Sequence, residues 1–241
     1  MKKFSFFLVA VISVMLFSCN SGTQTEQAKD TSSDAATTST TVTAPVFMPF
    51  DIVRLQFKVK DYGKWYAGFM SHDSIRLANG IHKYVVDRGL NGDSNMVIVV
   101  SKIDDLQMAK AFYSSAQIKK AMQQGGIIGM PKFEYLHIIS NDTTTIPQDR
   151  RVSVTHHVKN FEAWLKVYDG EGKDTRAANG IVDRAMARGI EDSNMVSIVF
   201  VVTDMDKAKA RIASPDLKKL MTDAGVDSAP DITFYRVVER F

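Results

Sequence analysis

Few side chains in this sequence are of types that carry out chemistry, and one of them stands out by its position. Cys19 is the only cysteine, so no disulfide can form within the chain. It follows the basic start Lys2-Lys3 and the mostly apolar run 4–17. That run is shorter than the about 20 residues of a membrane-spanning helix and is typical of a signal-peptide core. Cys19 is therefore placed for covalent modification after export.

Histidines are the candidate acids, bases and ligands, and the chain has five of them. His156 and His157 are adjacent on a predicted strand, so they point to opposite faces and at most one enters a given pocket. We take His157 as a candidate pocket residue, and His82 as a second one from an earlier segment. Either could transfer a proton near neutral pH. A structural or surface role is the alternative for each.

Two tryptophans and two arginines recur at equivalent places in the chain. Trp65 and Trp164 are the only tryptophans, each on a predicted helix, where they either line a pocket or anchor the core. Arg76 and Arg176 each precede an Asn-Gly pair. An arginine there could hold a carboxylate through two hydrogen bonds, or interact with the helix C-terminus. All four are candidate pocket residues.

Several function classes lose support from motifs and charge. The sequence has no Cys pair and no G-x-G-x-x-G, P-loop, H-E-x-x-H or G-x-S-x-G signature, so we expect no metal and no cofactor. The formal charge is +3 and falls to +1 if Lys2 and Lys3 are removed with a leader. A chain so close to neutral gives no basis for nucleic-acid binding.

Residues 52–241 contain two copies of one sequence repeat. Asp93-Ser94-Asn95-Met96-Val97 recurs identically as 192–196, and Ala78-Asn79-Gly80-Ile81 recurs as 178–181. The offset stays at 99 or 100 residues, which indicates a duplication. Each copy predicts a strand, a helix, two strands joined by a hairpin, a further helical pair and a last strand. In the first copy the expected elements are strand 53–59, helix 62–69, strands 82–88 and 96–100, a helix capped by Asp104 or Asp105, helix 115–124 and strand 132–139. In the second copy they are strand 151–156, helix 161–168, strands 181–188 and 195–202, a helix capped by Thr203 or Asp204, helix 214–223 and strand 231–238.

The order βαββαβ is that of the ferredoxin-like unit, an antiparallel sheet with helices on one face. The other face would then be a bare surface of aromatic and aliphatic side chains, which needs a partner. Two copies in one chain supply that partner. We therefore expect an α+β protein in which tandem ferredoxin-like repeats, 49–141 and 150–241, close into one barrel within a monomer.

The duplicated segment resembles the dimeric α/β-barrel superfamily, which includes antibiotic-biosynthesis monooxygenase-like domains. The resemblance is carried by Val59-Lys60-Asp61-Tyr62 with Trp65, by the Arg-to-Asn-Gly-Ile segments and by 214–221. It implies ligand binding between each sheet and its covering helices. The haem-degrading members use an Asn on the first strand, where this chain has Gln56 and Thr155, so their catalytic set does not transfer.

The N-terminus resembles the lipobox of bacterial lipoproteins, because a small residue and Cys19 follow the apolar core. That resemblance implies removal of 1–18 as a signal peptide, attachment of diacylglycerol to Cys19 and acylation of the new amino terminus. Residues 19–48 are rich in Ser and Thr and poor in apolar residues, which predicts a disordered tether. We expect a lipid-anchored protein of the bacterial cell envelope, at the outer membrane, facing the periplasm or the surface.

Two functions of different kinds remain open at this point. The first is a tethered module that binds a small apolar or aromatic ligand, or a partner protein, without catalysis. The second is a cofactor-independent monooxygenase, cyclase or isomerase, which the superfamily resemblance implies. An enzyme should have an accessible pocket that holds His157 or His82 beside an arginine.

Overall fold

Both repeats form the expected sequence of strands and helices. The computed structural model describes residues 47–90 and 92–241. The first repeat contains β1 (Phe50–Val59), α1 (Tyr62–Ser71), α2 (Asp73–Leu77), β2 (Ile81–Gly89), β3 (Met96–Ile103), α3 (Leu106–Ser114), α4 (Ala116–Gln124) and β4 (Ile127–Asn141). The second contains β5 (Arg150–His157), α5 (Phe161–Glu171), α6 (Lys173–Ala178), β6 (Ile181–Gly189), β7 (Met195–Val202), α7 (Met205–Ala213), α8 (Pro215–Asp223) and β8 (Asp231–Arg240).

Short polar side chains begin the helices at the same places in the two repeats. Asp61 accepts a hydrogen bond from the backbone N–H of Lys64 at 2.9 Å, before α1. Of the alternatives considered for α3 and α7, Asp105 and Asp204 are the N-caps. Such a cap satisfies a backbone N–H that the first helical turn leaves without a partner.

Gly180 ends the helical segment of the second repeat and has a backbone that requires glycine. Its φ is 78°, in the left-handed region that other residues rarely adopt. A Cβ at this position would lie 2.6 Å from the carbonyl oxygen of Asp204. The repeated Asn-Gly pair therefore brings the chain tightly against the start of α7 before β6 begins.

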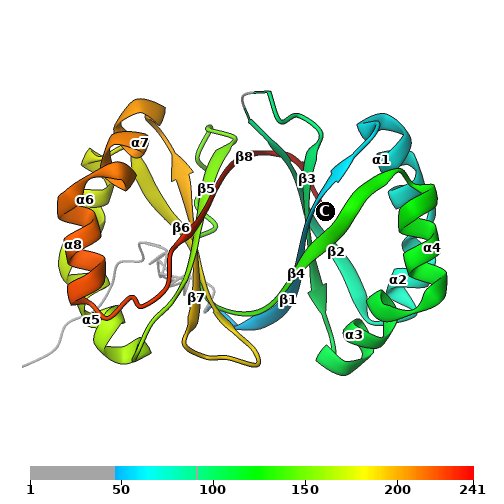
Figure 1. Ribbon diagram of the computed structural model, residues 1–241, viewed down its shortest axis with the longest axis horizontal. Helices are drawn as coiled ribbons and strands as arrows, with labels where there is room; N and C mark the ends of the chain where they lie inside the picture. The colour runs from blue at the N-terminus through cyan, green and yellow to red at the C-terminus, as the bar shows by residue number, and fades with distance from the viewer. Residues whose placement is uncertain (1–46, 91) are drawn as a thin grey trace, which may run out of the picture. The chain divides into compact units, whose positions relative to one another are not determined.

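The eight strands form one closed barrel in the order β1-β3-β2-β8-β5-β7-β6-β4. Figure 1 shows α1–α4 covering one side of the strands and α5–α8 covering the other. The halves join twice, where β2 pairs with β8 and where β4 pairs with β6, both antiparallel. The expected α+β fold, with tandem ferredoxin-like repeats and an intrachain barrel, is confirmed.

Each half has its own apolar core between sheet and helices. Val53, Leu55 and Phe57 of β1 pack against Trp65 and the neighbouring helices. In the second half, Val152 and Phe200 are among the residues that pack around Trp164. Because strand residues alternate between faces, the residues between these core positions point into the barrel.

The expectation of a purely apolar inner face is wrong, because charged and polar side chains share it with aliphatic ones. Arg54 forms an ion pair with Glu134 and donates a hydrogen bond to Thr155 at 3.1 Å. Ile52, Leu136 and Ile138 form an apolar cluster elsewhere on the same face. The second repeat therefore supplies hydrogen-bonding partners as well as apolar cover to the first.

Several element boundaries differ from those expected, and β3 for example extends to Ile103 instead of ending at 100. The first helix of each repeat is followed by a separate short helix, which begins after His72 in one case and after Gly172 in the other. The last strand of the first repeat begins at Ile127 instead of 132, because its early residues pair with Lys58 and Val59 across an irregularity in β1. The signal peptide expected at 1–18 and the tether expected at 19–48, except for its last two residues, lie outside the described residues.

Candidate functional site

Each repeat has a cavity between its sheet and its helices, and the two cavities differ fourfold in size. The cavity of the first repeat, here called cavity 1, has a volume of about 330 Å³. The equivalent cavity 2 of the second repeat has a volume of about 80 Å³. Ligand pockets for small organic molecules usually span about 300–1,000 Å³. Only cavity 1 reaches that range.

Cavity 1 has apolar walls and an opening marked by exposed polar side chains. Lys64, His72 and Gln124 are exposed and also line the cavity, so they surround its mouth beside α1 and α4. None of the residues that line cavity 2 is exposed. The apolar walls of cavity 1 include Leu55, Phe57, Trp65, Phe69, Ile75, Val99, Phe112, Ile118, Met122 and Ile127.

Aromatic contacts hold the wall of cavity 1 in place. Trp65 stacks on Phe69, with ring centroids 5.2 Å apart, and meets Phe57 edge-on at 5.5 Å. Trp65 is 5% exposed, so it anchors the core and lines the cavity at the same time. The helical spacing of Trp65 and Phe69 on α1 places both rings on the side that faces the sheet.

Arg76 is the buried cation of cavity 1, and only part of its guanidinium group is used. One nitrogen, Nη2, donates to the carbonyl oxygen of Phe69 at 2.7 Å and to Asp73 at 3.2 Å. The guanidinium carbon lies 4.0 Å from the centre of the Phe69 ring. Nε is buried without a hydrogen-bond partner, although Arg76 is only 6% exposed. Among the described residues, Nη1 has no partner either.

The charge of Arg76 is balanced only by a shared carboxylate. Burial lowers the pKa of Arg76, and Asp73 opposes that shift. Asp73 also binds Lys83 at 2.7 Å, and this hydrogen bond lowers the pKa of Asp73. An arginine remains charged at neutral pH under such conditions. Cavity 1 therefore offers a cation with unused donors inside an apolar wall.

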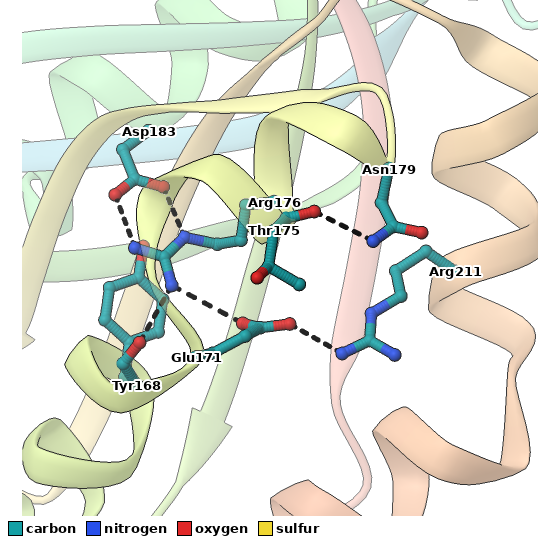
Figure 2. Close-up of polar contacts among 7 residues, drawn as sticks. All are labelled: Tyr168, Glu171, Thr175, Arg176, Asn179, Asp183 and Arg211. Carbon is teal, nitrogen blue, oxygen red and sulfur yellow. Dashed lines mark hydrogen bonds and ion pairs between the residues drawn. The ribbon is translucent and has the colours of Figure 1, made fainter.

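In cavity 2 the equivalent Arg176 is bound on several sides (Figure 2). Its Nε and Nη2 donate to the two carboxylate oxygens of Asp183 at 2.7 and 2.8 Å. Its Nη1 donates to the carbonyl oxygen of Tyr168 at 2.8 Å and to Glu171 at 3.4 Å. Burial acts to lower the pKa of Arg176, but the bond to Asp183 raises it. Arg176 therefore has a structural role.

The same network ties the helices of the second repeat together. Glu171, at the end of α5, accepts a hydrogen bond from Arg211 of α7 at 2.6 Å. Figure 2 shows Glu171 between the two arginines. The first repeat has His72 and Phe112 at these positions, so it cannot form this connection.

His156 faces cavity 2 and has no polar partner. It is 3% exposed, and its ring meets Trp164 edge-on with centroids 5.6 Å apart. Both ring nitrogens are buried without a hydrogen bond. Burial lowers the pKa of His156 to about 4, so this side chain is neutral at pH 7. The first repeat has Phe57 at the same position.

The candidate histidines lie outside both cavities. His157 pairs through Nδ1 with Asp227 at 2.6 Å, and its other ring nitrogen lies 3.6 Å from Asp192. The hydrogen bond to Asp227 raises the pKa of His157. His82 pairs with Asp104 at 3.0 Å on the surface. The structure thus brings Trp65 together with Arg76, and Trp164 with Arg176, without either of these histidines.

Sequence reasoning missed His156, although the sequence contained a signal for it. On β5, His156 has the same parity as Val152 and Val154, and it replaces Phe57 of the other repeat. Both observations place it on the core face. Tyr113, which also lines cavity 1, had no counterpart that would mark it. Cys19 lies outside the described residues.

A wider depression of about 500 Å³ lies at one end of the barrel. Its charged groups are already paired, since Lys132 contacts both Glu134 and Asp231. Among residues 47–90 and 92–241, no group of three or more His, Cys, Asp or Glu side chains is placed to hold a metal ion. In the same ranges no helix is long and apolar enough to span a membrane.

Comparisons with known proteins show the fold. No family profile and no curated protein matches the sequence. An anthrone oxidase-like protein has a similar structure, with a TM-score of 0.52 and 17% identity over 79% of this chain and 92% of that one. A proposed monooxygenase from Fusobacterium nucleatum gives a TM-score of 0.50 and 12% identity over 79% of this chain and 93% of that one. The chain thus shares its fold, a barrel of two ferredoxin-like α+β units, with these two proteins.

Proposed function

We propose that this protein is an envelope lipoprotein, anchored through an acylated Cys19, whose cavity 1 binds a small, largely apolar molecule bearing one anionic group. The observation that carries the proposal is Arg76, which keeps unused donors while it lines an apolar cavity of about 330 Å³. A buried donor without a partner is costly. A carboxylate or similar group on an apolar ligand removes that cost and pairs with the charge.

The first experiment identifies what the protein carries. The full chain, purified in detergent from its own host, is analysed by native mass spectrometry before and after denaturation. We expect a retained small molecule with an acidic group and an apolar body. Retention of a molecule without an acidic group would contradict the role of Arg76, and the absence of any bound molecule would contradict ligand binding under these conditions.

The second experiment uses a defined pair of probes, 2-naphthoate and 2-naphthamide, which differ in charge and share an aromatic body. Calorimetric titration should show tighter binding of the naphthoate. Arg76→Gln should weaken naphthoate binding about 10- to 100-fold, the range for a hydrogen bond to a charged group, and change naphthamide binding little. The matched control is Arg88→Gln, since Arg88 contacts the ring of Tyr62 outside the cavity lining. Equal losses in the two variants would contradict the proposal.

The anchor is tested independently of the ligand. Cys19→Ser should move the protein from the membrane fraction to the soluble fraction, because several acyl chains are required for stable anchoring. Ser21→Ala, two residues away, is the matched control and should stay with the membrane. Continued membrane association of the Cys19 variant would refute lipidation at this residue.

A second candidate function is a cofactor-independent monooxygenase, cyclase or isomerase. It is supported by the names given to the structures with a similar fold and by His72 and Tyr113, which line cavity 1 together with Arg76. The expected neighbours of an arginine were His157 and His82, and neither lies there. Binding without catalysis is therefore the better-supported function. Aerobic conversion of the retained molecule, with gain of an oxygen atom or an isomeric product, would favour the enzyme.

A further inference from the structure

A third cavity lies inside the barrel, on the opposite face of the sheets from cavities 1 and 2. Its volume is about 100 Å³, and all eight strands contribute to its lining. Four of the lining residues are arginines: Arg54, Arg151, Arg184 and Arg240. We call this space the barrel cavity.

Most of this positive charge has no carboxylate partner. Arg54 pairs with Glu134. Arg151, by contrast, donates to the main-chain carbonyl oxygens of Gln148 and Arg150, and Arg184 donates to that of Thr144 at 2.7 Å. Arg240 has no hydrogen bond or ion pair among the described residues. Among the described residues, Arg151 and Arg240 thus face this space without an ion-pair partner, and Asp142 offsets part of the charge of Arg184.

The arginines are close enough to repel one another. Burial lowers the pKa of Arg151, and Arg240 and Arg184 lower it further. Burial likewise lowers the pKa of Arg184, with Arg240 adding to the shift. Like charges held close together repel, and here Arg151 is buried, Arg184 half-buried and Arg240 exposed at the rim. The arrangement therefore favours an anion in the space between them.

The one carboxyl group in the lining does not provide that counter-charge. Asp87 is 3% exposed, and its Oδ1 is buried without a partner. Burial raises the pKa of Asp87 to about 8, against the opposing effect of Arg240, Arg151 and Arg54. Burial thus favours the protonated form of Asp87, and a protonated carboxyl can donate a hydrogen bond.

We propose that the barrel cavity binds a small tetrahedral oxyanion, phosphate or sulfate, between Arg151, Arg184 and Arg240. The planar guanidinium matches two oxygens of such an anion at once. A water molecule takes up about 30 Å³, so the space of about 100 Å³ holds an ion of this size but no larger organic phosphate body. Aliphatic side chains such as Val100 and Val199 form part of the remaining lining.

This site does not depend on the function proposed for cavity 1. Adjacent residues of a strand point to opposite faces, so Arg54 points into the barrel while Leu55, which lines cavity 1, points to the helices. Loss of naphthoate binding and loss of phosphate binding are therefore separate results.

The test is calorimetric titration of the full chain in detergent with sodium phosphate, sodium sulfate and sodium acetate. Sodium chloride at the same ionic strength is the control for screening. We expect saturable binding of phosphate or sulfate with one site per chain. Binding of acetate alone would show that the site takes carboxylates instead and would overturn the proposal, as would the absence of saturable binding of all three anions.

The variants concentrate on the two arginines that are less buried and whose loss the fold tolerates best. The double variant Arg184→Gln, Arg240→Gln should weaken phosphate or sulfate binding more than tenfold. Arg236→Gln, exposed like Arg240 and on the same strand but outside the cavity lining, should leave phosphate or sulfate binding within twofold. Circular dichroism checks that all variants fold. Equal effects of the double variant and of Arg236→Gln would overturn the proposed position.

Discussion

Cavities 1 and 2 lie at equivalent places in the two repeats, but they differ in how completely the hydrogen-bond donors of their buried arginine are used. In cavity 1, Arg76 keeps unused donors, and exposed residues mark an opening. In cavity 2, Arg176 is saturated by Asp183, Glu171 and a carbonyl, and no lining residue is exposed. Two identical subunits would have to change both pockets together. Fusion into one chain lets one pocket stay open while the other becomes a packed core.

The two cavities should differ most in the stability that is lost when the acid bound to each arginine is removed. Asp183→Ala should lower the free energy of unfolding by about 3 kcal/mol or more, because it leaves a buried guanidinium without its main partner. The equivalent acid in space is Asp73, which is more exposed and shared with Lys83. Asp73→Ala also leaves a buried guanidinium without its acid, but only one bond of 3.2 Å is lost, so we expect a smaller effect, about 1–2 kcal/mol. Denaturant unfolding measures both, and equal losses would show that the two arginines are held alike.

The next largest effect is a loss of folding stability at acidic pH that depends on His156. Below pH 6.5 the unfolded chain takes up a proton at this side chain, whereas the folded chain does so only near pH 4. Stability from this group is thus lost as the pH falls from 6.5 to 4, by about 3 kcal/mol in total. His156→Phe, which installs the residue found at position 57, should remove this component from unfolding curves measured across that range.

A control separates this effect from general acid unfolding. His157→Gln removes the neighbouring histidine, which faces the other way, and should leave the acid-dependent loss in place. Parallel curves for the native protein and for His156→Phe would show that His156 is not the group that is held neutral.

A smaller effect is expected when a larger side chain occupies part of cavity 1, as a leucine does at the equivalent position of cavity 2. Ala121 lines cavity 1 where Leu220 lines cavity 2. Ala121→Leu should weaken binding of 2-naphthoate more than tenfold and change the free energy of unfolding by no more than about 1.5 kcal/mol, since the leucine enters an existing space. Gln123→Leu, at an exposed position on the same helix, is the control. Unchanged affinity in Ala121→Leu would place the ligand elsewhere.

The smallest expected effect is a change in the pKa of His157 at the protein surface. His157 occupies the position of Lys58, and Asp192 that of Asp93, so an ion pair recurs with a different cation. Because the bond to Asp227 raises the pKa of His157, this interaction is present at low pH and lost as pH rises through that pKa. Titration by NMR should show that Asp227→Asn lowers the pKa of His157.

Asp216→Asn, an exposed change on α8, is the control for that titration and should leave the pKa of His157 unchanged. A pKa of His157 that does not respond to Asp227→Asn would contradict the assigned hydrogen bond.

The fold could be predicted because the duplication repeats every structural signal. Strand alternation, helix caps and the Asn-Gly pairs agreed between copies, and agreement across levels is a strong guide to structure. The composition of the barrel interior could not be predicted in the same way. Asp87 lies next to a shift in the pairing of β2 with β8, and such irregularities change which side chains face inward.

The candidate site was predictable in part. The repeat marked the two tryptophans and the two arginines as equivalent pairs, and the structure places Trp65 and Arg76 in the lining of cavity 1 and Trp164 and Arg176 in that of cavity 2. It could not show that Arg176 is saturated, since that depends on Asp183, where the first repeat has Lys83. The choice between His156 and His157 was decidable from parity along β5, a signal that was present but not weighed.

The two strand junctions that close the barrel have a consequence for the connection between the repeats. Both junctions pair strands across the halves, β2 with β8 and β4 with β6. Asp142, Thr144 and Asp149 still bond to β6 or β8, whereas residues 145–147 take no part in these contacts. A cut within 145–147 would therefore leave every strand pairing in place and yield a nicked ring of two fragments. The peptide link between the repeats raises the effective concentration of one half for the other. The strand edges of β2, β4, β6 and β8 determine which strands pair when the two halves associate.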